Sequence, residues 1–446
     1  MKGNDMSDRP AIKRRDRDTI IQALRAGVVP KLGLQHIQVG RAREIEEVVK
    51  DIERIAEGGA AIRFIIGDYG SGKTFFLNLA RLVALEKGMV VMSADLAPDR
   101  RIHATAGQAQ ALYAEMARNT STRTKPDGGA MANIVERFVA QAVRQADQEE
   151  REAGAVIRDK LAHLEELKGG YDFATVIAKY WEGHETGDED LKSNTLRWLR
   201  AEFSTKTDAR KALGVRTIID DSGVYDHLKV FGAFVREAGY RGLVVSLDEL
   251  VNLYKLTSSQ ARNANFEQIL RILNDVLQGG ASHIGFMLGG TPEFLMDTRR
   301  GLYSYEALRS RLAENMFARD GLVDLSGPVI RLASLTQEDL FVLLANIRRV
   351  FQGDDGLPDE ALTAFMSHCS NRIGDAYFRT PRNTVMAFVN MLAVMEQNPS
   401  VDWREMIGAA VIEDDPGEDM SDVIDDGDQP VGGAGDGDDN LASFKL

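Results

Sequence analysis

The feature that most constrains the fold is a glycine-rich loop between an apolar run and an amphipathic segment, in FIIGDYGSGKTFFL at residues 64–77. Such a loop surrounds a chain of phosphates with backbone N–H groups, which requires a buried strand before it and a helix directly behind it. We expect that strand at 62–66. The pattern G-x-x-x-x-G-K-[ST] is filled by Gly67, Asp68, Tyr69, Gly70, Ser71, Gly72, Lys73 and Thr74.

Two side chains of this loop are expected to contact nucleotide and metal. Lys73 would reach the β- and γ-phosphates of a nucleoside triphosphate, and the Thr74 hydroxyl would ligate Mg²⁺. We also count Phe75, the next residue, with the nucleotide-binding set. ATP and Mg²⁺ are therefore the expected cofactors.

A second apolar run ends in paired acids. Residues 242–247 of YRGLVVSLDEL predict a short buried strand, followed at once by Asp248 and Glu249. A parallel strand would deliver both carboxylates at the carboxyl edge of its sheet. In P-loop enzymes the first acid holds Mg²⁺, and a second acid is suited to polarise the attacking water. The alternative is an acidic helix start after a core strand, and the upstream loop favours the catalytic interpretation.

Charge is unevenly distributed along the chain. The 446 residues carry a net charge of −14, but residues 413–446 hold 12 Asp or Glu against one Lys, a net of −11 that leaves −3 for the rest. The remainder is thus compatible with a DNA-binding face. Basic clusters at 13–15, 299–300 and 348–349 would supply it, although most such clusters are solvated surface.

Other sequence features restrict the cellular setting. The single cysteine, Cys369, excludes an internal disulfide framework and fits a reducing compartment. The N-terminus lacks the apolar core of a signal peptide, and no run approaches 18 apolar residues. We therefore expect a cytoplasmic protein without membrane contact.

Hydrophobic periodicity divides the chain into units. Apolar residues recur at helical spacing through 101–229 and again through 336–398, with further strands expected at 89–97, 283–290 and 328–332. Pro381 stands near a helix start with Arg382 in the first turn, where an arginine suggests a bound anion or is plain surface. The expected units are a basic N-terminal segment (1–18), an α/β core (19–100 and 230–334), a helical insertion (101–229), a helical lid (335–412) and an acidic disordered tail (413–446).

The order of these elements resembles that of AAA+ ATPases. VGRAREIE, IIGDYGSGKT, LVVSLDEL and TPRNTV resemble the Gly-Arg box, the two Walker motifs and the sensor 2 helix of the Orc/Cdc6-like branch. More narrowly, GDYGSGKTFFL, GLVVSLDELVNLY, GGTPEF, RGLYSYEALRSRL and RTPRNTV resemble the ATP-binding proteins of phage-exclusion (BREX) gene clusters, the BrxD type, over most of residues 19–412. The implied fold is α/β, an AAA+ P-loop NTPase core with a parallel sheet, a large helical insertion and a C-terminal helical lid.

The resemblance also implies roles for individual residues. Lys73 and Thr74 would bind phosphate and Mg²⁺. Asp248 would be the Walker B acid and a metal ligand, and Glu249 would be the catalytic base.

Four further residues match the sensor and finger positions of the resembled family. Thr291 falls at sensor 1 and Arg382 at sensor 2. Arg309 or Arg311 falls where an arginine finger is expected, which implies a homo-oligomer.

The sequence departs from the resembled family in two respects. Only 14 residues, 399–412, separate the lid helices from the acidic tail, so the DNA-reading winged-helix domain of typical Orc/Cdc6 proteins is not expected. The helical stretch 101–229 is also longer than the single helix usual there.

The resemblance implies an ATP-hydrolysing motor or switch in bacterial antiphage defence, with double-stranded DNA and other defence-system proteins as candidate partners. Two alternatives remain. One is a DNA-loading ATPase, either a helicase loader or a transposition regulator. The other is a nucleotide-gated assembly scaffold with negligible turnover. The apolar end of the tail, LASFKL, would be a partner-binding segment or simply the end of a solubilising tether.

Overall fold

A five-stranded sheet forms the centre of the computed structural model, which describes residues 12–318, 323–353 and 356–410. The acidic tail predicted at 413–446 lies outside these residues, as does most of the predicted N-terminal segment. The strand order is β2-β3-β4-β1-β5, and every neighbouring pair is parallel. The strands are β1 (Ala60–Ile66), β2 (Val90–Asp95), β3 (Leu243–Asp248), β4 (Ile284–Gly290) and β5 (Val329–Arg331).

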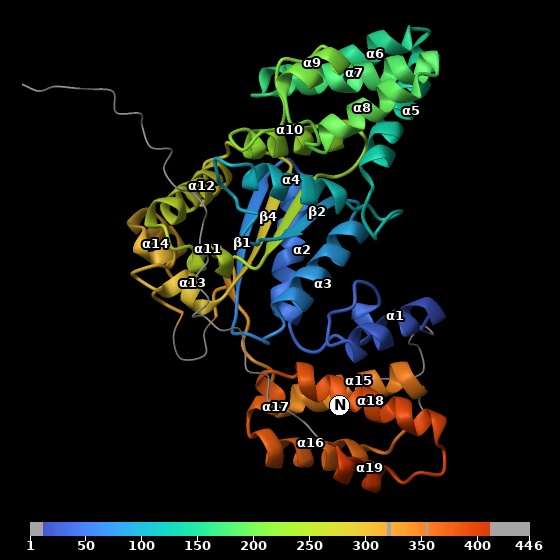
Figure 1. The fold of residues 1–446 in the computed structure, drawn as a ribbon, viewed down its shortest axis with the longest axis vertical. Helices are drawn as coiled ribbons and strands as arrows, with labels where there is room; N and C mark the ends of the chain where they lie inside the picture. Colours follow the sequence, from blue (N-terminus) through green and yellow to red (C-terminus); the bar gives the residue numbers. More distant parts are fainter. Residues whose placement is uncertain (1–11, 319–322, 354–355, 411–446) are drawn as a thin grey trace, which may run out of the picture.

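Helices cover both faces of the sheet, as a parallel sheet requires (Figure 1). Side chains alternate along β1, so that Ala61 and Ile65 pack with α2 (Ala42–Ala56) and α3 (Lys73–Glu86). Ile62 and Phe64 point to the opposite face and share a core with other helices. The two faces therefore have separate hydrophobic cores, and the P-loop helix α3 belongs to only one of them.

Helices fill the long connection between β2 and β3. In Figure 1 the helices α5 to α9 lie at one end of the molecule, while α4 and α10 lie next to the sheet. Their apolar residues join the larger core, which is why this stretch shows helical periodicity in the sequence. The elements are α4 (Gln108–Arg118), α5 (Met131–Glu149), α6 (Ala153–Leu161), η2 (Ala162–Glu166), α7 (Gly170–Thr186), α8 (Glu189–Leu199), α9 (Lys206–Leu213) and α10 (Val224–Glu237).

Short helices follow the carboxyl ends of β3 and β4. The longest helix of this region, α12, packs on the same sheet face as α4 and α10. The elements are α11 (Val251–Lys255), α12 (Ser259–Leu277), α13 (Pro292–Met296), η3 (Leu302–Ser304) and α14 (Glu306–Leu312).

The helices after β5, which the sequence predicted as a lid and which we call the lid, lie at the other end of the molecule, across the sheet from the helices between β2 and β3 (Figure 1). The hydrophobic core of the lid also contains Leu79 of α3, so the lid and the P-loop helix share one core. The lid elements are α15 (Gln337–Gln352), α16 (Asp359–Ile373), α17 (Ala376–Arg379), α18 (Arg382–Gln397) and α19 (Trp403–Ala409).

The N-terminal helix packs on this lid. α1 (Arg14–Arg25) is followed by η1 (Leu34–His36), and Ile20 of α1 is buried in the lid core. Arg17 donates hydrogen bonds to the carbonyls of Val350 and Phe351, at 3.1 and 2.7 Å, where α15 ends. The helix begins at Arg14 and so crosses the boundary that the sequence predicted at residue 18, and residues on both sides of that boundary, Arg17 and Ile20, pack on the lid.

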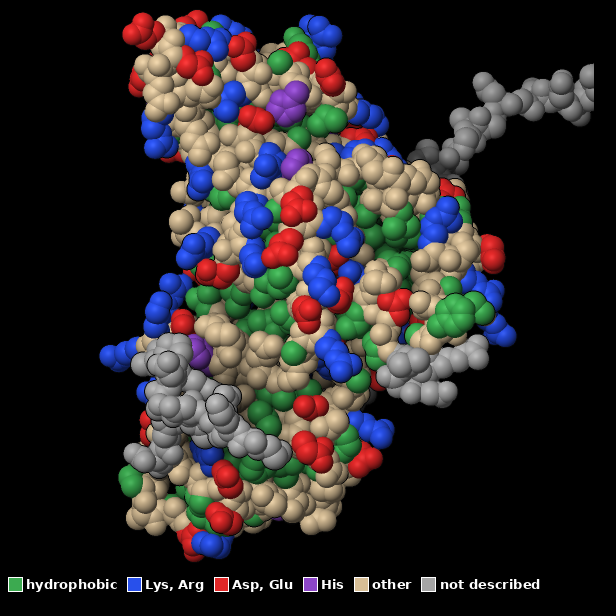
Figure 2. Space-filling model, turned by 180° about the vertical axis from the view of Figure 1, so that it is seen from behind, with side chains coloured by type: hydrophobic (Ala, Val, Ile, Leu, Met, Phe, Trp, Pro, Cys, Tyr) green, Lys and Arg blue, Asp and Glu red, His purple; other side chains and the backbone are tan. Residues whose placement is uncertain are grey.

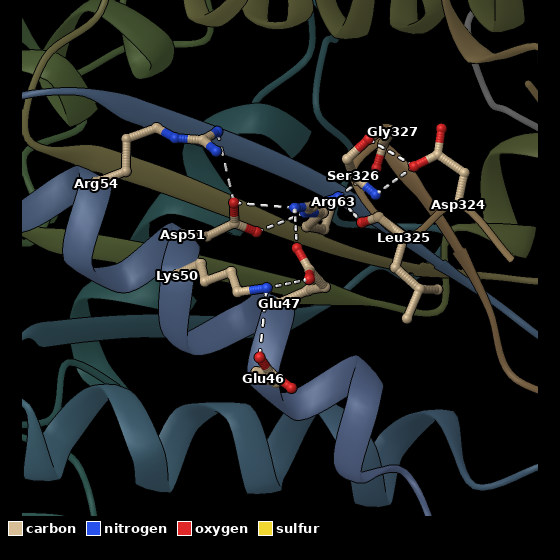
Figure 3. A network of polar contacts seen from close by, with 10 residues as sticks. All are labelled: Glu46, Glu47, Lys50, Asp51, Arg54, Arg63, Asp324, Leu325, Ser326 and Gly327. Carbon is tan, nitrogen blue, oxygen red and sulfur yellow. Dashed lines mark hydrogen bonds and ion pairs between the residues drawn. The ribbon is translucent and has the colours of Figure 1, made fainter.

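A buried arginine ties β1 to the segment that leads into β5 (Figure 3). The Arg63 side chain is 4% exposed and faces Asp51 of α2, which is 1% exposed, with Nε–Oδ2 and Nη2–Oδ1 distances of 2.5 and 3.0 Å. The same guanidinium donates to the carbonyls of Leu325 and Gly327. A charge in this position is tolerated because carboxylate and carbonyl oxygens satisfy its donors.

Candidate nucleotide-binding site

The predicted P-loop connects β1 to α3 at the carboxyl edge of the sheet, the edge at which β3 and β4 deliver the other candidate residues. α3 begins at Lys73, and its N-cap is Gly72 with φ 88°, a conformation that favours glycine. Among the described residues, no side chain caps this N-terminus. Since the first N–H groups of a helix have no intrahelical partner, they are available to an anion.

The polar groups of the loop fit a phosphate ligand. Lys73 Nζ lies over the loop, 3.0 Å from the Gly67 carbonyl and 2.9 Å from the Asp68 carbonyl. Ser71 Oγ is buried and has no hydrogen-bond partner within the part of the chain that the structure describes. A cationic group, helix N–H groups and an unsatisfied hydroxyl therefore occur together in one loop.

The two predicted metal ligands are in contact. Thr74 Oγ1 donates to Asp248 Oδ2 at 2.7 Å, although the residues are 174 positions apart in sequence. Asp248 is 7% exposed, and a Cβ placed on the neighbouring Gly289 would lie 2.3 Å from its Oδ1, so only glycine leaves room for the carboxylate. Hydroxyl and carboxylate oxygens are the ligands that Mg²⁺ prefers, and Mg²⁺ takes its other ligands from phosphate and water. The site thus fits a metal-nucleotide complex.

Glu249 adopts an unusual backbone conformation. Its φ is 58°, which is rare for a residue other than glycine. The turn is held by its own hydrogen bonds, because Asn252 N donates to the Glu249 carbonyl at 3.0 Å and Leu250 N donates to the Gly289 carbonyl at 3.0 Å. Backbone strain that the surroundings enforce is typical of functional positions.

The sensor candidates lie beside the same edge. Thr291 follows β4 directly, and its hydroxyl caps α13 by accepting a hydrogen bond from Phe294 N at 3.4 Å. Arg382 is the first residue of α18, as the sequence predicted for the helix start. Its Nη1 donates to Tyr69 Oη at 3.2 Å and its Nε to the Gly27 carbonyl at 2.8 Å, so it joins the lid to the P-loop.

The two candidate finger arginines have local contacts. Arg309 is 56% exposed and lies 4.0 Å from Glu306 of its own helix, and Arg311 Nη1 donates to the Ala307 carbonyl at 2.7 Å.

The side chain of Phe75 points away from the phosphate side of the loop, because it packs against the lid core. Its backbone N–H remains at the start of α3.

Two residues near the site were not predicted. Asp95 is paired with Asp248 in the β2–β3 register, and partial burial together with the Asp248 carboxylate raises the pKa of Asp95 above its ordinary value. The sequence feature that could have predicted Asp95 is its position as the acid that ends the apolar run MVVMSAD. Arg41 donates a hydrogen bond to the Ser71 carbonyl of the P-loop. The sequence feature that could have pointed to Arg41 is the Gly-Arg pair at 40–41.

A parallel sheet with a P-loop at its carboxyl edge, and with a carboxylate from another strand bonded to the P-loop threonine, defines a P-loop NTPase-like core. Comparison with protein families identifies the chain more narrowly. The model of the family described as BREX system ATP-binding protein BrxC/D matches residues 12–411, and the chain therefore belongs to this family. A search of curated proteins found no match.

Among the described helices, none has both the length and the apolar composition needed to cross a membrane.

Proposed function

We propose that this protein is an AAA+ ATPase that binds and hydrolyses ATP with Mg²⁺, and that it acts as a motor or switch in BREX antiphage defence. The observation that carries the proposal is the 2.7 Å contact between Thr74 Oγ1 and Asp248 Oδ2, which joins the two sequence motifs at one sheet edge. Membership of a BREX ATP-binding family supports both ATP binding and a role in this defence system.

Each candidate residue would have its own role in ATP hydrolysis. Lys73 and the N-terminus of α3 would bind the phosphates, and Thr74 with Asp248 would hold Mg²⁺. The metal, when bound, neutralises charge on the β- and γ-phosphates. Glu249 would orient the attacking water and accept its proton.

Arg309 or Arg311 would complete the site from a neighbouring subunit. Their local contacts within one chain and the exposure of Arg309 support this role. Thr291 and Arg382 would sense the γ-phosphate from β4 and from the lid. The proposed assembly is therefore a cytoplasmic homo-oligomer with nucleotide at the subunit boundary.

Candidate partners are double-stranded DNA and other defence-system proteins. On the face shown in Figure 2, Lys and Arg side chains are interspersed with Asp and Glu rather than gathered in one continuous patch. Binding of DNA would therefore use another face or a channel formed by several subunits.

One set of measurements separates the candidate functions: ATP hydrolysis with and without double-stranded DNA, together with the mass of the protein with ATP. Turnover that depends on assembly supports the proposal. Hydrolysis stimulated by DNA and steeply reduced by salt indicates a DNA-loading ATPase. Assembly with ATP but without turnover indicates a scaffold, and the absence of ATP binding contradicts all three.

A further inference from the structure

Arg41 occupies a strained position at the start of α2. Its φ and ψ are 64° and 14°, a left-handed conformation that is uncommon for a residue with a side chain. The side chain is 14% exposed, and its Nη1 lies 3.6 Å from Glu44 Oε1, one turn along the helix. Such strain persists only where the surroundings enforce it, so the contacts of this side chain need an explanation beyond the helix itself.

Those contacts join two other parts of the molecule. Arg41 Nη2 donates to the Ser71 carbonyl of the P-loop at 3.4 Å and to the Ala333 carbonyl. Ala333 belongs to residues 332–336, which connect β5 of the core to α15 of the lid. One partly buried side chain therefore links the P-loop to the core–lid connection.

This connection also lies directly against the P-loop. Leu332 N donates to the Ile66 carbonyl at 2.7 Å, just before the loop begins. A Cβ on Gly67 would lie 3.2 Å from the Leu332 carbonyl and 2.3 Å from Ser71 Oγ, so loop and connection are closely packed. A displacement of Ser71 would therefore also displace residues 332–336, the connection between core and lid.

We propose that Arg41 is a positioning residue that couples the P-loop to the core–lid connection. When the P-loop adjusts to phosphates, the Ser71 carbonyl moves, and Arg41 transmits the movement to Ala333 and so to the lid. The nucleotide-dependent part of this inference rests on the proposed function. A planar guanidinium can donate in fixed directions to two carbonyls, whereas a lysine ammonium is a point charge without that geometry.

The test measures amide hydrogen exchange over residues 332–337 in the full-length protein, with and without Mg-ATP. The variants are Arg41→Ala, Arg41→Lys and Arg41→Gly, and the control is Arg43→Ala, an exposed arginine of the same helix. Arg41→Gly removes the side chain and the backbone strain together, so it separates coupling from misfolding.

Without nucleotide, we expect all three Arg41 variants to exchange about tenfold faster over 332–337 than wild type, because the hydrogen bonds to a charged donor are lost. With Mg-ATP, the wild type and Arg43→Ala should become protected in this segment, and the Arg41 variants should not. Binding of a fluorescent ATP analogue should weaken by up to about tenfold in the variants.

Several results would overturn the inference. Wild-type exchange over 332–337 in Arg41→Gly, or full restoration by Arg41→Lys, would show that the guanidinium geometry does not hold the connection. If the wild type fails to bind ATP, the proposed function fails, but exchange in the nucleotide-free protein still decides whether Arg41 holds the connection.

Discussion

The carboxyl edge of the sheet and helix α14 both carry residues predicted to act on ATP, yet only the first is assembled within one chain. At the sheet edge, Thr74 and Asp248 meet at 2.7 Å across 174 residues of sequence. On α14, Arg309 forms an ion pair with Glu306 and Arg311 donates to the Ala307 carbonyl, so both side-chain contacts lie within their own helix. The fold of one chain therefore brings the candidate nucleotide and metal ligands together, while the proposed arginine finger would come from a second chain.

The difference also shows what holds each region in place. Asp248 is fixed by buried strands and by the space that Gly289 leaves. Helix α14 is followed by a segment that Arg63 holds through the carbonyls of Leu325 and Gly327. Helix α14 itself packs in the main core through Leu308 and Leu312, so the Arg63–Asp51 ion pair fixes the segment before β5 rather than the helix.

The largest expected effect belongs to α14. The variant Arg309→Ala or Arg311→Ala should lose about a thousandfold or more in hydrolysis rate, as for other arginine fingers, while ATP affinity stays close to wild type. Mixing the inactive variant with Lys73→Ala should restore some activity, since each subunit supplies what the other lacks. If proven mixed oligomers remain inactive at every ratio, the arginines do not act between subunits.

The next effect concerns the stability of the segment after α14. Arg63→Ala removes the buried partner of the Asp51 carboxylate, leaves it only the exposed Arg54, and should lower the free energy of unfolding by about 3–5 kcal/mol. Arg54→Ala is a matched control, because Arg54 is 59% exposed and lies 3.6 Å from the same aspartate. Its loss should cost at most about 1 kcal/mol. Denaturant unfolding of both variants measures the difference, and equal costs would mean that Arg63 does not anchor the segment.

A third variant separates phosphate binding from catalysis. Lys73→Ala should weaken ATP binding by about a hundredfold, because a charge-assisted contact to the phosphates is lost. Titration with a fluorescent ATP analogue measures this. Wild-type affinity in this variant would show that the loop binds no phosphate through Lys73.

The smallest expected effect belongs to Gly289→Ala, which tests whether Asp248 is a metal ligand. A Cβ in Gly289→Ala would meet Asp248 Oδ1 at 2.3 Å and displace the carboxylate. We expect about a tenfold loss of ATP affinity in the presence of Mg²⁺ and little loss in EDTA. Gly408→Ala is the control, because no atom of the described residues outside its own helix turn lies within 4 Å of the added Cβ. An equal loss in EDTA would mean that the variant damages the loop rather than the metal site.

The sequence predicted those parts of the site that are local motifs. Strands β1, β3 and β4, the loop at 67–74 and the acids after 247 follow from apolar runs and the residues that end them. The contacts of Arg41 could not be predicted, because they join it to residues 30 and 292 positions away. The packing of α1 on the lid was missed for the same reason: periodicity reveals an apolar face but not the surface that covers it.

The most direct test of the central claim, that the sheet edge binds and hydrolyses Mg-ATP, is the Glu249→Gln variant. Its amide keeps the shape of the side chain but cannot accept a proton, so hydrolysis should fall by about a hundred- to ten-thousandfold. The measurement is the nucleotide that the purified variant retains after incubation with Mg-ATP. We predict intact ATP in Glu249→Gln and ADP in the wild type. Turnover at the wild-type rate, or no bound nucleotide in either protein, would contradict the assignment.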